Sequence, residues 1–246
     1  MYKEKRYDII FWDVDGTLLD FLRSERYALT DCLTHFGLPV SDEIVDTYSR
    51  INEACWKKLE RGEVNRPWVL RHRFEELFDY LHIRDVDVAA FQERYQQKLG
   101  SVFYFQDNGK ELLIKLKADF KQYVVTNGVE STQRMKIEGS GMGTLLEDFF
   151  ISEDIGFDKP DSRFFEACLE RIAEKEGTMP DLNRILIVGD SMTSDMEGGR
   201  RMGIDCCHYR KGSHFFINRG KEGPTYTIGN LWEVEKILWQ DHPIKN

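Results

Sequence analysis

Short, mostly apolar runs separated by helical patterns constrain the fold of this 246-residue chain more than any other feature. The clearest runs are residues 7–12, 123–125, 149–151, 185–188 and 204–208. Continuous rather than alternating apolarity is typical of strands that are covered on both faces, as in a parallel sheet. Helical stripes such as Leu112, Leu113 and Leu116 lie between the runs. This alternation predicts an α/β fold with a doubly wound parallel sheet.

Residues 20–100 interrupt the alternation, because they contain helical stripes and no convincing strand. One stripe places Leu70, Phe74, Leu77, Phe78 and Leu81 on a single helix face. About 80 residues are far more than the single helix of an ordinary crossover needs. We therefore expect a helical cap subdomain at 20–100, inserted into a core domain of residues 1–19 and 101–246. Hinges near residues 20–21 and 100–108 would let the cap move over the carboxyl ends of the strands.

Composition narrows the class of partner. The net charge of −9, from 34 basic and 43 acidic residues, disfavours a protein that grips nucleic acid by its phosphates. No apolar run approaches the roughly 20 residues that cross a bilayer, and the charged N-terminus lacks the apolar stretch of a secretory signal. The five cysteines have no C-x-x-C spacing and are expected to be buried free thiols. We expect a cytoplasmic protein without nucleic-acid or membrane partners, and no surface pattern sets its oligomeric state.

The segment Asp13-Val14-Asp15-Gly16-Thr17 directly follows the first apolar run. Two carboxylates that are two residues apart at the end of a strand point to the same side of it. Ligands of open α/β sheets bind just outside the carboxyl ends of the strands. One carboxylate can attack an electrophile while the other moves protons, and a divalent cation would screen two acids this close together. This division of labour suits phosphoryl transfer.

Thr126-Asn127-Gly128 follows the second run and offers a hydroxyl and backbone N–H groups to phosphate oxygens. Asn-Gly is also a strong hairpin signal. Because good helix formers follow the segment, we favour a strand-to-helix turn over a hairpin.

Two further segments carry charged groups toward the same edge. Lys159 precedes a helix that starts near Asp161, and close to the acids its ammonium would neutralise a phosphate, although a solvated surface lysine is the alternative. Asp190 follows the fourth run, where its carboxylate suits a Mg²⁺ shell. Asp195 lies five residues further on, where helix capping explains an acid as well as function does.

These four segments, in this order, resemble the motifs of the haloacid dehalogenase-like (HAD) hydrolase superfamily. The D-x-D-G-T of that family matches Asp13 to Thr17, and its strand-terminal Ser/Thr matches Thr126. Its lysine matches Lys159, and its Gly-Asp pair with a later Asp matches Gly189 to Asp195. The resemblance implies a Rossmann-like core with a helical cap inserted after the first motif, as the gap between the first two runs also indicates.

The resemblance also implies a role for each residue. Asp13 would attack phosphorus and become an aspartyl phosphate, while Asp15 would protonate the leaving oxygen and later activate the water. The groups implied for Mg²⁺ are the carboxylates of Asp13 and Asp190 and the backbone carbonyl of Asp15. The groups implied for phosphoryl binding are Thr126, the Asn127 N–H and Lys159, with Asp195 hydrogen-bonded to Lys159 or to metal-bound water.

A closer likeness, over roughly residues 7–229, is to the YjjG/YfnB-type branch of noncanonical pyrimidine 5′-nucleotidases, with small departures at Trp12 and Asp158. It implies a Mg²⁺-dependent phosphatase that acts on nucleoside 5′-monophosphates, a small-molecule phosphate monoester substrate. Because dehalogenases resemble D-x-Y-G-T, Asp15 indicates an oxygen leaving group. The alternatives are a sugar-phosphate phosphatase, a β-phosphoglucomutase-like phosphomutase, and a non-catalytic binding protein on the same fold.

Substrate choice depends on the cap in this interpretation. The loop at residues 61–66 is expected to lie between cap helices and to reach down to the site. Arg66 and Arg73 are candidates to contact substrate, and Trp68 and Phe74 are candidates to stack on a base. Each has a simpler explanation, since exposed arginines are common and Phe74 belongs to an apolar stripe.

Overall fold

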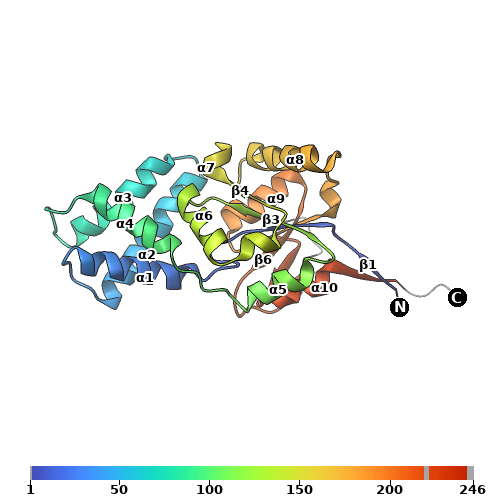
Figure 1. Cartoon of the computed structure of the whole chain (residues 1–246), viewed down its shortest axis with the longest axis horizontal. Coiled ribbons are helices and arrows are strands. Elements are labelled where there is room, and N and C mark those ends of the chain that lie inside the picture. Colours follow the sequence, from blue (N-terminus) through green and yellow to red (C-terminus); the bar gives the residue numbers. More distant parts are fainter. Residues whose placement is uncertain (1, 219–221, 243–246) are drawn as a thin grey trace.

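The computed structural model describes residues 2–218 and 222–242, which form a largely parallel sheet between helices, with a separate group of helices at one end (Figure 1). The described strands of the main sheet run in the order β4-β3-β2-β5-β6-β8-β7, with β7 antiparallel to β8. Their bounds are β2 Ile9–Trp12, β3 Lys121–Thr126, β4 Asp148–Ile151, β5 Ile185–Gly189, β6 Asp205–Tyr209, β7 Phe216–Ile217 and β8 Tyr226–Ile228. The predicted α/β class is confirmed, and β2 to β6 correspond to the predicted runs.

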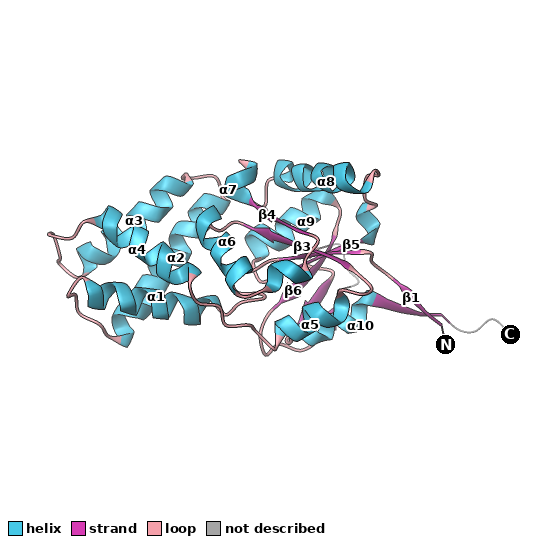
Figure 2. Cartoon of the chain, in the orientation of Figure 1, coloured by secondary structure: helices cyan, strands magenta, loops and turns pink. Residues whose placement is uncertain are grey.

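A two-stranded antiparallel ribbon extends beyond the main sheet and is formed by β1 (Tyr2–Lys5) and β9 (Trp239–His242) (Figure 2). The apolar pattern did not predict these two strands, nor β7 and β8. All four are short, and β1 has the sequence Tyr-Lys-Glu-Lys. Strands of this kind form because a partner strand is present, which a run of apolar residues cannot signal.

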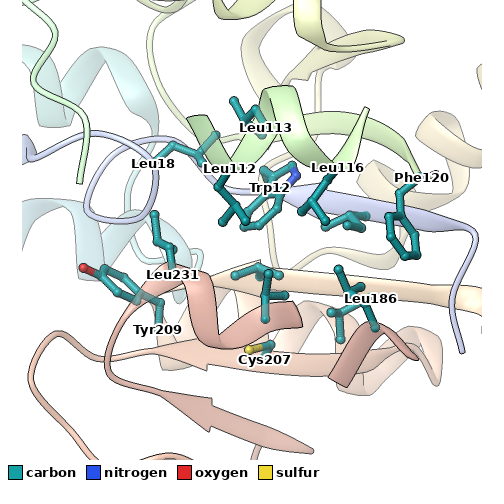
Figure 3. Packing of buried hydrophobic residues seen from close by; sticks show 14 of the residues in the cluster. Trp12, Leu18, Leu112, Leu113, Leu116, Phe120, Leu186, Cys207, Tyr209 and Leu231 are labelled. Carbon is teal, nitrogen blue, oxygen red and sulfur yellow. The ribbon is translucent and has the colours of Figure 1, made fainter. Parts of the chain in front are cut away.

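Helices cover both faces of the main sheet, as a doubly wound fold requires. The described helices of this part are α5 Gly109–Leu116, α6 Glu130–Gly139, α7 Ser152–Ile155, α8 Ser162–Glu176, α9 Glu197–Met202 and α10 Glu235–Leu238. Successive residues of β2 contribute to different clusters: Trp12 packs with Leu112 and Leu116 of α5 (Figure 3), and Phe11 packs with Phe164 of α8. Strand alternation thereby gives one sheet two buried faces.

The group of helices at the other end of the molecule consists of α1 Phe21–His35, α2 Asp42–Glu60, α3 Arg66–Tyr80 and α4 Val88–Gly100. Side chains of Asp20, Ser41, Asn65 and Asp87 cap their N-termini. These helices share a hydrophobic cluster of their own, which includes Phe74 and Leu77 and whose described members all lie between residues 21 and 99. On this ground we propose that residues 20–100 form a cap subdomain on a core of residues 1–19 and 101–246.

Register in the sheet determines where the polar segments meet. Trp12 of β2 pairs with Val124 of β3 on one side and with Val188 of β5 on the other. The segments that follow these three parallel strands therefore leave the sheet at one edge. Within residues 2–218 and 222–242, every helix is too short or too polar to span a bilayer. The five cysteines are buried and unbridged, as expected.

Candidate active site

Asp13, the first residue after β2, is joined to a buried lysine. The ammonium of Lys159 donates to Asp13 Oδ1 at 2.9 Å, to Asp195 Oδ1 at 2.6 Å and to the backbone carbonyl of Val125 at 2.8 Å. Lys159 is 1 % exposed, so the solvated surface position that was its alternative is wrong. A buried ammonium needs such partners, because an unpaired charge in the interior is costly.

Burial and neighbouring charges set the protonation of this pair. Burial raises the pKa of Asp13 to about 7, against the opposing effect of the Lys159 ammonium, and the Asp195 carboxylate adds to the rise. Burial alone would lower the pKa of Lys159, but the carboxylates of Asp13 and Asp195 outweigh it and raise that pKa. Lys159 is therefore a fixed positive charge beside Asp13, while the crowded carboxylates need further positive charge to be ionised together.

Carboxylate oxygens of Asp13, Asp190 and Asp195 lie within 4.8 Å of one another. Oδ2 of Asp13 is buried and has no hydrogen-bond partner among residues 2–218 and 222–242. Both oxygens of Asp195 are already engaged, Oδ1 by Lys159 and Oδ2 by the Ser191 N–H at 3.1 Å. Asp13 and Asp190 thus offer the freer oxygens, and an all-oxygen donor set of this kind fits Mg²⁺. Asp195 stands behind them and holds Lys159.

Gly16 is required by the close approach of Asp190. Its φ of +94° is strained for other residues, and a Cβ at this position would overlap the Asp190 carboxylate. The next residue, Thr17, donates from Oγ1 to Asp190 Oδ1 at 3.3 Å. The Gly-Thr pair of the first segment therefore fits around the carboxylate that follows β5.

Thr126 and Asn127 lie at the end of β3, and α6 begins at Glu130, so the predicted strand-to-helix turn is confirmed. The Asn127 side chain makes two hydrogen bonds to the backbone of Lys159. Nδ2 donates to the Lys159 carbonyl and Oδ1 accepts from the Lys159 N–H, both at 2.8 Å. The Gly128 N–H donates to Thr126 Oγ1 at 3.3 Å. Asn127 thus positions Lys159 with its side chain, a function that its place in the sequence did not signal.

Asp15 has two partners that sequence reasoning missed. Lys136 Nζ donates to Asp15 Oδ1 at 2.5 Å, and Gln133 Nε2 donates to Asp15 Oδ2 at 2.6 Å. Both donors lie on α6, three residues apart, so they share a helix face. In the sequence, Lys136 is a single lysine next to the apolar Ile137. A lysine in that position is equally compatible with the surface of a helix, so it did not signal a contact with Asp15.

The two cap arginines occupy different environments. Arg66, at the start of α3, reaches into the core, where Nη2 donates to Ser152 Oγ at 2.5 Å, to the Asn127 carbonyl at 3.4 Å and to the Asp158 carboxylate. Arg73 is 1 % exposed inside the cap, where it donates to Asn52 Oδ1 at 2.9 Å and Gln92 Oε1 at 2.8 Å. The prediction that Arg73 faces substrate is thus not supported, because its guanidinium is enclosed by cap side chains.

A cleft lies between the loop that joins α2 to α3 and the core. It has a volume of about 840 Å³, and its lining includes Glu60 and Arg66 from the cap and Phe157, Lys159 and Thr193 from the core. Thr193 Oγ1 donates to Glu60 Oε2 at 2.5 Å across it. The loop at 61–66 therefore lines a cleft that borders the Lys159 segment, and the cleft has room for a small organic phosphate. Among the described residues, Asp13, Asp15 and Asp190 do not line it.

The fold and these motif positions belong to a known class. Residues 7–203 match the model of the haloacid dehalogenase-like hydrolase family, and the chain belongs to that family. It is 33% identical over 235 residues to the HAD-hydrolase YfnB of Bacillus subtilis (strain 168), with 95% of this chain and 96% of YfnB covered. A crystal structure of YfnB bound to magnesium, described as revealing interdomain movement, matches with a TM-score of 0.84 over 95% of this chain and 99% of that one.

Two further relatives belong to the branch that the motifs resemble. Pyrimidine 5′-nucleotidase PynA of Streptococcus pneumoniae is 32% identical over 94% of this chain and 95% of its own length. Pyrimidine 5′-nucleotidase YjjG of Escherichia coli K12 is 25% identical over 95% of this chain and 98% of its own length. The resemblance stated from the sequence is confirmed, and the protein is a hydrolase.

Proposed function

We propose that this protein is a Mg²⁺-dependent phosphatase that hydrolyses nucleoside 5′-monophosphates through an aspartyl phosphate on Asp13. The observation that carries the proposal is the asymmetry of the Asp13 carboxylate. Lys159 holds Oδ1, whereas Oδ2 is buried without a partner in the described part of the chain. A nucleophilic carboxylate that shares its second oxygen with a cation needs this arrangement.

In the first half of the reaction, Asp13 Oδ1 forms a bond to phosphorus while the bond from phosphorus to the ester oxygen breaks. Asp15 supplies the proton that the leaving oxygen takes up. The Lys159 ammonium, the Thr126 hydroxyl and the Asn127 N–H hold the phosphoryl oxygens and stabilise the charge that develops on them.

In the second half, water attacks phosphorus, and Asp15 takes the proton from that water. Inorganic phosphate leaves and the Asp13 carboxylate is restored, so protons and bonds balance over the cycle. When Mg²⁺ is bound by Asp13, Asp190 and the Asp15 carbonyl, it neutralises charge on the phosphoryl group and among the carboxylates. Asp195 keeps Lys159 aimed at Asp13.

The substrate class rests on the relatives and on the cleft. PynA and YjjG are named as pyrimidine 5′-nucleotidases, and a cleft of about 840 Å³ beside Lys159 accommodates a nucleoside. Arg66 binds the core at Ser152 and Asp158 and also lines this cleft. We propose that it closes the cap over the substrate. The same proposal includes a small-molecule phosphate monoester as the substrate and a cytoplasmic location for the protein.

Phosphate release from a panel of nucleoside monophosphates and sugar phosphates, with and without Mg²⁺, tests the function. We expect release from pyrimidine 5′-monophosphates that stops when EDTA removes the metal. Preference for hexose phosphates over all pyrimidine monophosphates would overturn the nucleotidase proposal and keep the phosphatase. Transfer to a second sugar hydroxyl without accumulation of phosphate would favour the phosphomutase alternative.

A further inference from the structure

The Asp15 carboxylate is held by two buried side chains of a single core helix. Lys136 is 0 % exposed and Gln133 is 1 % exposed, and each donates to a different oxygen of Asp15. Asp15 itself keeps a 22% exposed side chain. Burying a lysine side chain completely is costly unless its ammonium is paired. A fold that only needed α6 to pack against the sheet would be better served by an apolar residue at this position.

The segment before α6 provides space for this arrangement. A Cβ at Gly128 would overlap the amide of Gln133. The third residue of Thr126-Asn127-Gly128 therefore allows Gln133 to lie across the turn and reach Asp15. This gives the glycine a role in the site that is separate from the phosphate-binding role expected of the segment.

Contacts on its cap side hold α6 itself in place. Thr132 Oγ1 donates to Gln96 Oε1 of α4 at 2.7 Å. The Lys136 ammonium lies 5.7 Å from the centre of the Phe21 ring, at the start of α1. The helix that carries the two donors therefore contacts the first and the last cap helix, α1 and α4, as well as Asp15.

From this geometry we infer that Lys136 and Gln133 are positioning residues that fix the orientation from which Asp15 serves the leaving oxygen and the water. One donor on each oxygen fixes the plane of the carboxylate, which a single contact would leave free to rotate. Neither residue touches substrate in this scheme. The inference rests on the proposed phosphatase function, because it concerns the proton-carrying step of that reaction.

Leaving-group dependence separates a role in proton transfer from a role in stability. Nitrophenolate leaves readily without a proton, whereas the 5′-oxygen of uridine 5′-monophosphate needs one. For Lys136→Met we expect kcat with uridine 5′-monophosphate to fall by about 10- to 100-fold with KM little changed. The loss with p-nitrophenyl phosphate should be about tenfold smaller. Arg134→Met, which removes a half-exposed positive charge from the same helix, is the matched control.

A double substitution links the effect to Asp15. In an Asp15→Asn background, Lys136→Met should lower the remaining p-nitrophenyl phosphatase activity by no more than about twofold. The effects of two substitutions do not add when one residue acts through the other. If Lys136→Met does not fold, as circular dichroism would show, Gln133→Met takes its place in the same comparison. The inference would be overturned, and the proposed function kept, by either of two results. One is an equal loss of kcat with both substrates in Lys136→Met, and the other is a loss that is just as large in the Asp15→Asn background. Absence of phosphatase activity in the unaltered protein would overturn the proposed function and this inference together.

Discussion

Two regions of the molecule bury carboxylates, and they differ in what those carboxylates bind. In the core, one oxygen of Asp13 accepts from Lys159 and the other has no partner among the described residues. In the cap, Oε1 of Glu25 accepts from Asn52 at 2.8 Å and Oε2 accepts from Ser49. Burial raises the pKa of both carboxyl groups to about 7. A shifted pKa therefore does not separate the two regions, whereas the free oxygen of Asp13 does.

The cap carboxylate is part of a closed network. Arg73 donates to Asn52 Oδ1 at 2.9 Å, and Asn52 Nδ2 in turn donates to Glu25 Oε1. All three side chains are buried, and the Arg73 guanidinium lies 4.9 Å from the ring centres of Phe74 and Tyr95, which belong to the hydrophobic cluster of the cap. We conclude that the buried charges of the cap fix the packing of its helices, while those of the core are arranged for chemistry.

The largest expected effect is that of Asp13→Asn. We expect kcat with any monoester to fall by about 10⁴-fold or more, because the nucleophile is lost, with no loss of thermal stability. Steady-state phosphate release measures the loss of kcat, and a thermal melt measures the stability. The exposed helix cap Asp181 offers a control, since Asp181→Asn should change neither quantity. Substantial residual turnover in Asp13→Asn would refute the nucleophile assignment.

Arg73→Met should show the opposite pattern. Removing one member of a buried charged network costs about 3–5 kcal/mol of unfolding free energy, while kcat of the folded protein should change by less than about tenfold. Urea unfolding measures the first quantity. Arg71→Met is the matched control on the same helix, because Arg71 pairs with Glu75 at the surface with a 74% exposed side chain. A loss of activity as large as that of Asp13→Asn, with stability unchanged, would move Arg73 into the active site.

The pH dependence of stability should show the buried Glu25. Its pKa in the folded protein lies above that of the unfolded chain, so the contribution of Glu25 to stability is fully present below the unfolded value near 4.5 and is lost as the pH rises through about 7. The charged groups around it are Arg73 and Glu53. Glu25→Gln should therefore gain about 1–3 kcal/mol relative to the unaltered protein between pH 5 and pH 8. Glu53→Gln, at an exposed site, should show no such trend.

The smallest effect concerns the contact that joins the two regions. Arg66→Gln removes a charged partner of Asp158 and Ser152, and we expect KM to rise by about threefold to tenfold with kcat nearly unchanged. Arg71→Gln, on the same helix but 74% exposed and paired with Glu75 at the surface, is its control. Equal KM values for the two variants would remove Arg66 from the closing contact.

Residues that follow buried strands could be located from the sequence. Asp13 and Asp190 each follow an apolar run, and parallel register brings the ends of such runs together. Lys136 and Gln133 could not be located, because which face of α6 meets Asp15 depends on how that helix is rotated against the sheet. Arg73 was misplaced for a related reason: a charged residue on an amphipathic helix suggests exposure, and the two hydrogen-bond partners that allow its burial, Asn52 and Gln92, come from other helices.

Trapping the covalent intermediate tests the central claim most directly. Rapid acid quench during turnover of uridine 5′-monophosphate, followed by mass spectrometry of the peptides, reports where a phosphoryl group resides. The account predicts a transient phosphoryl group on the peptide that contains Asp13, absent from Asp13→Asn. A phosphoryl group on another residue, or none while phosphate is being released, would contradict it.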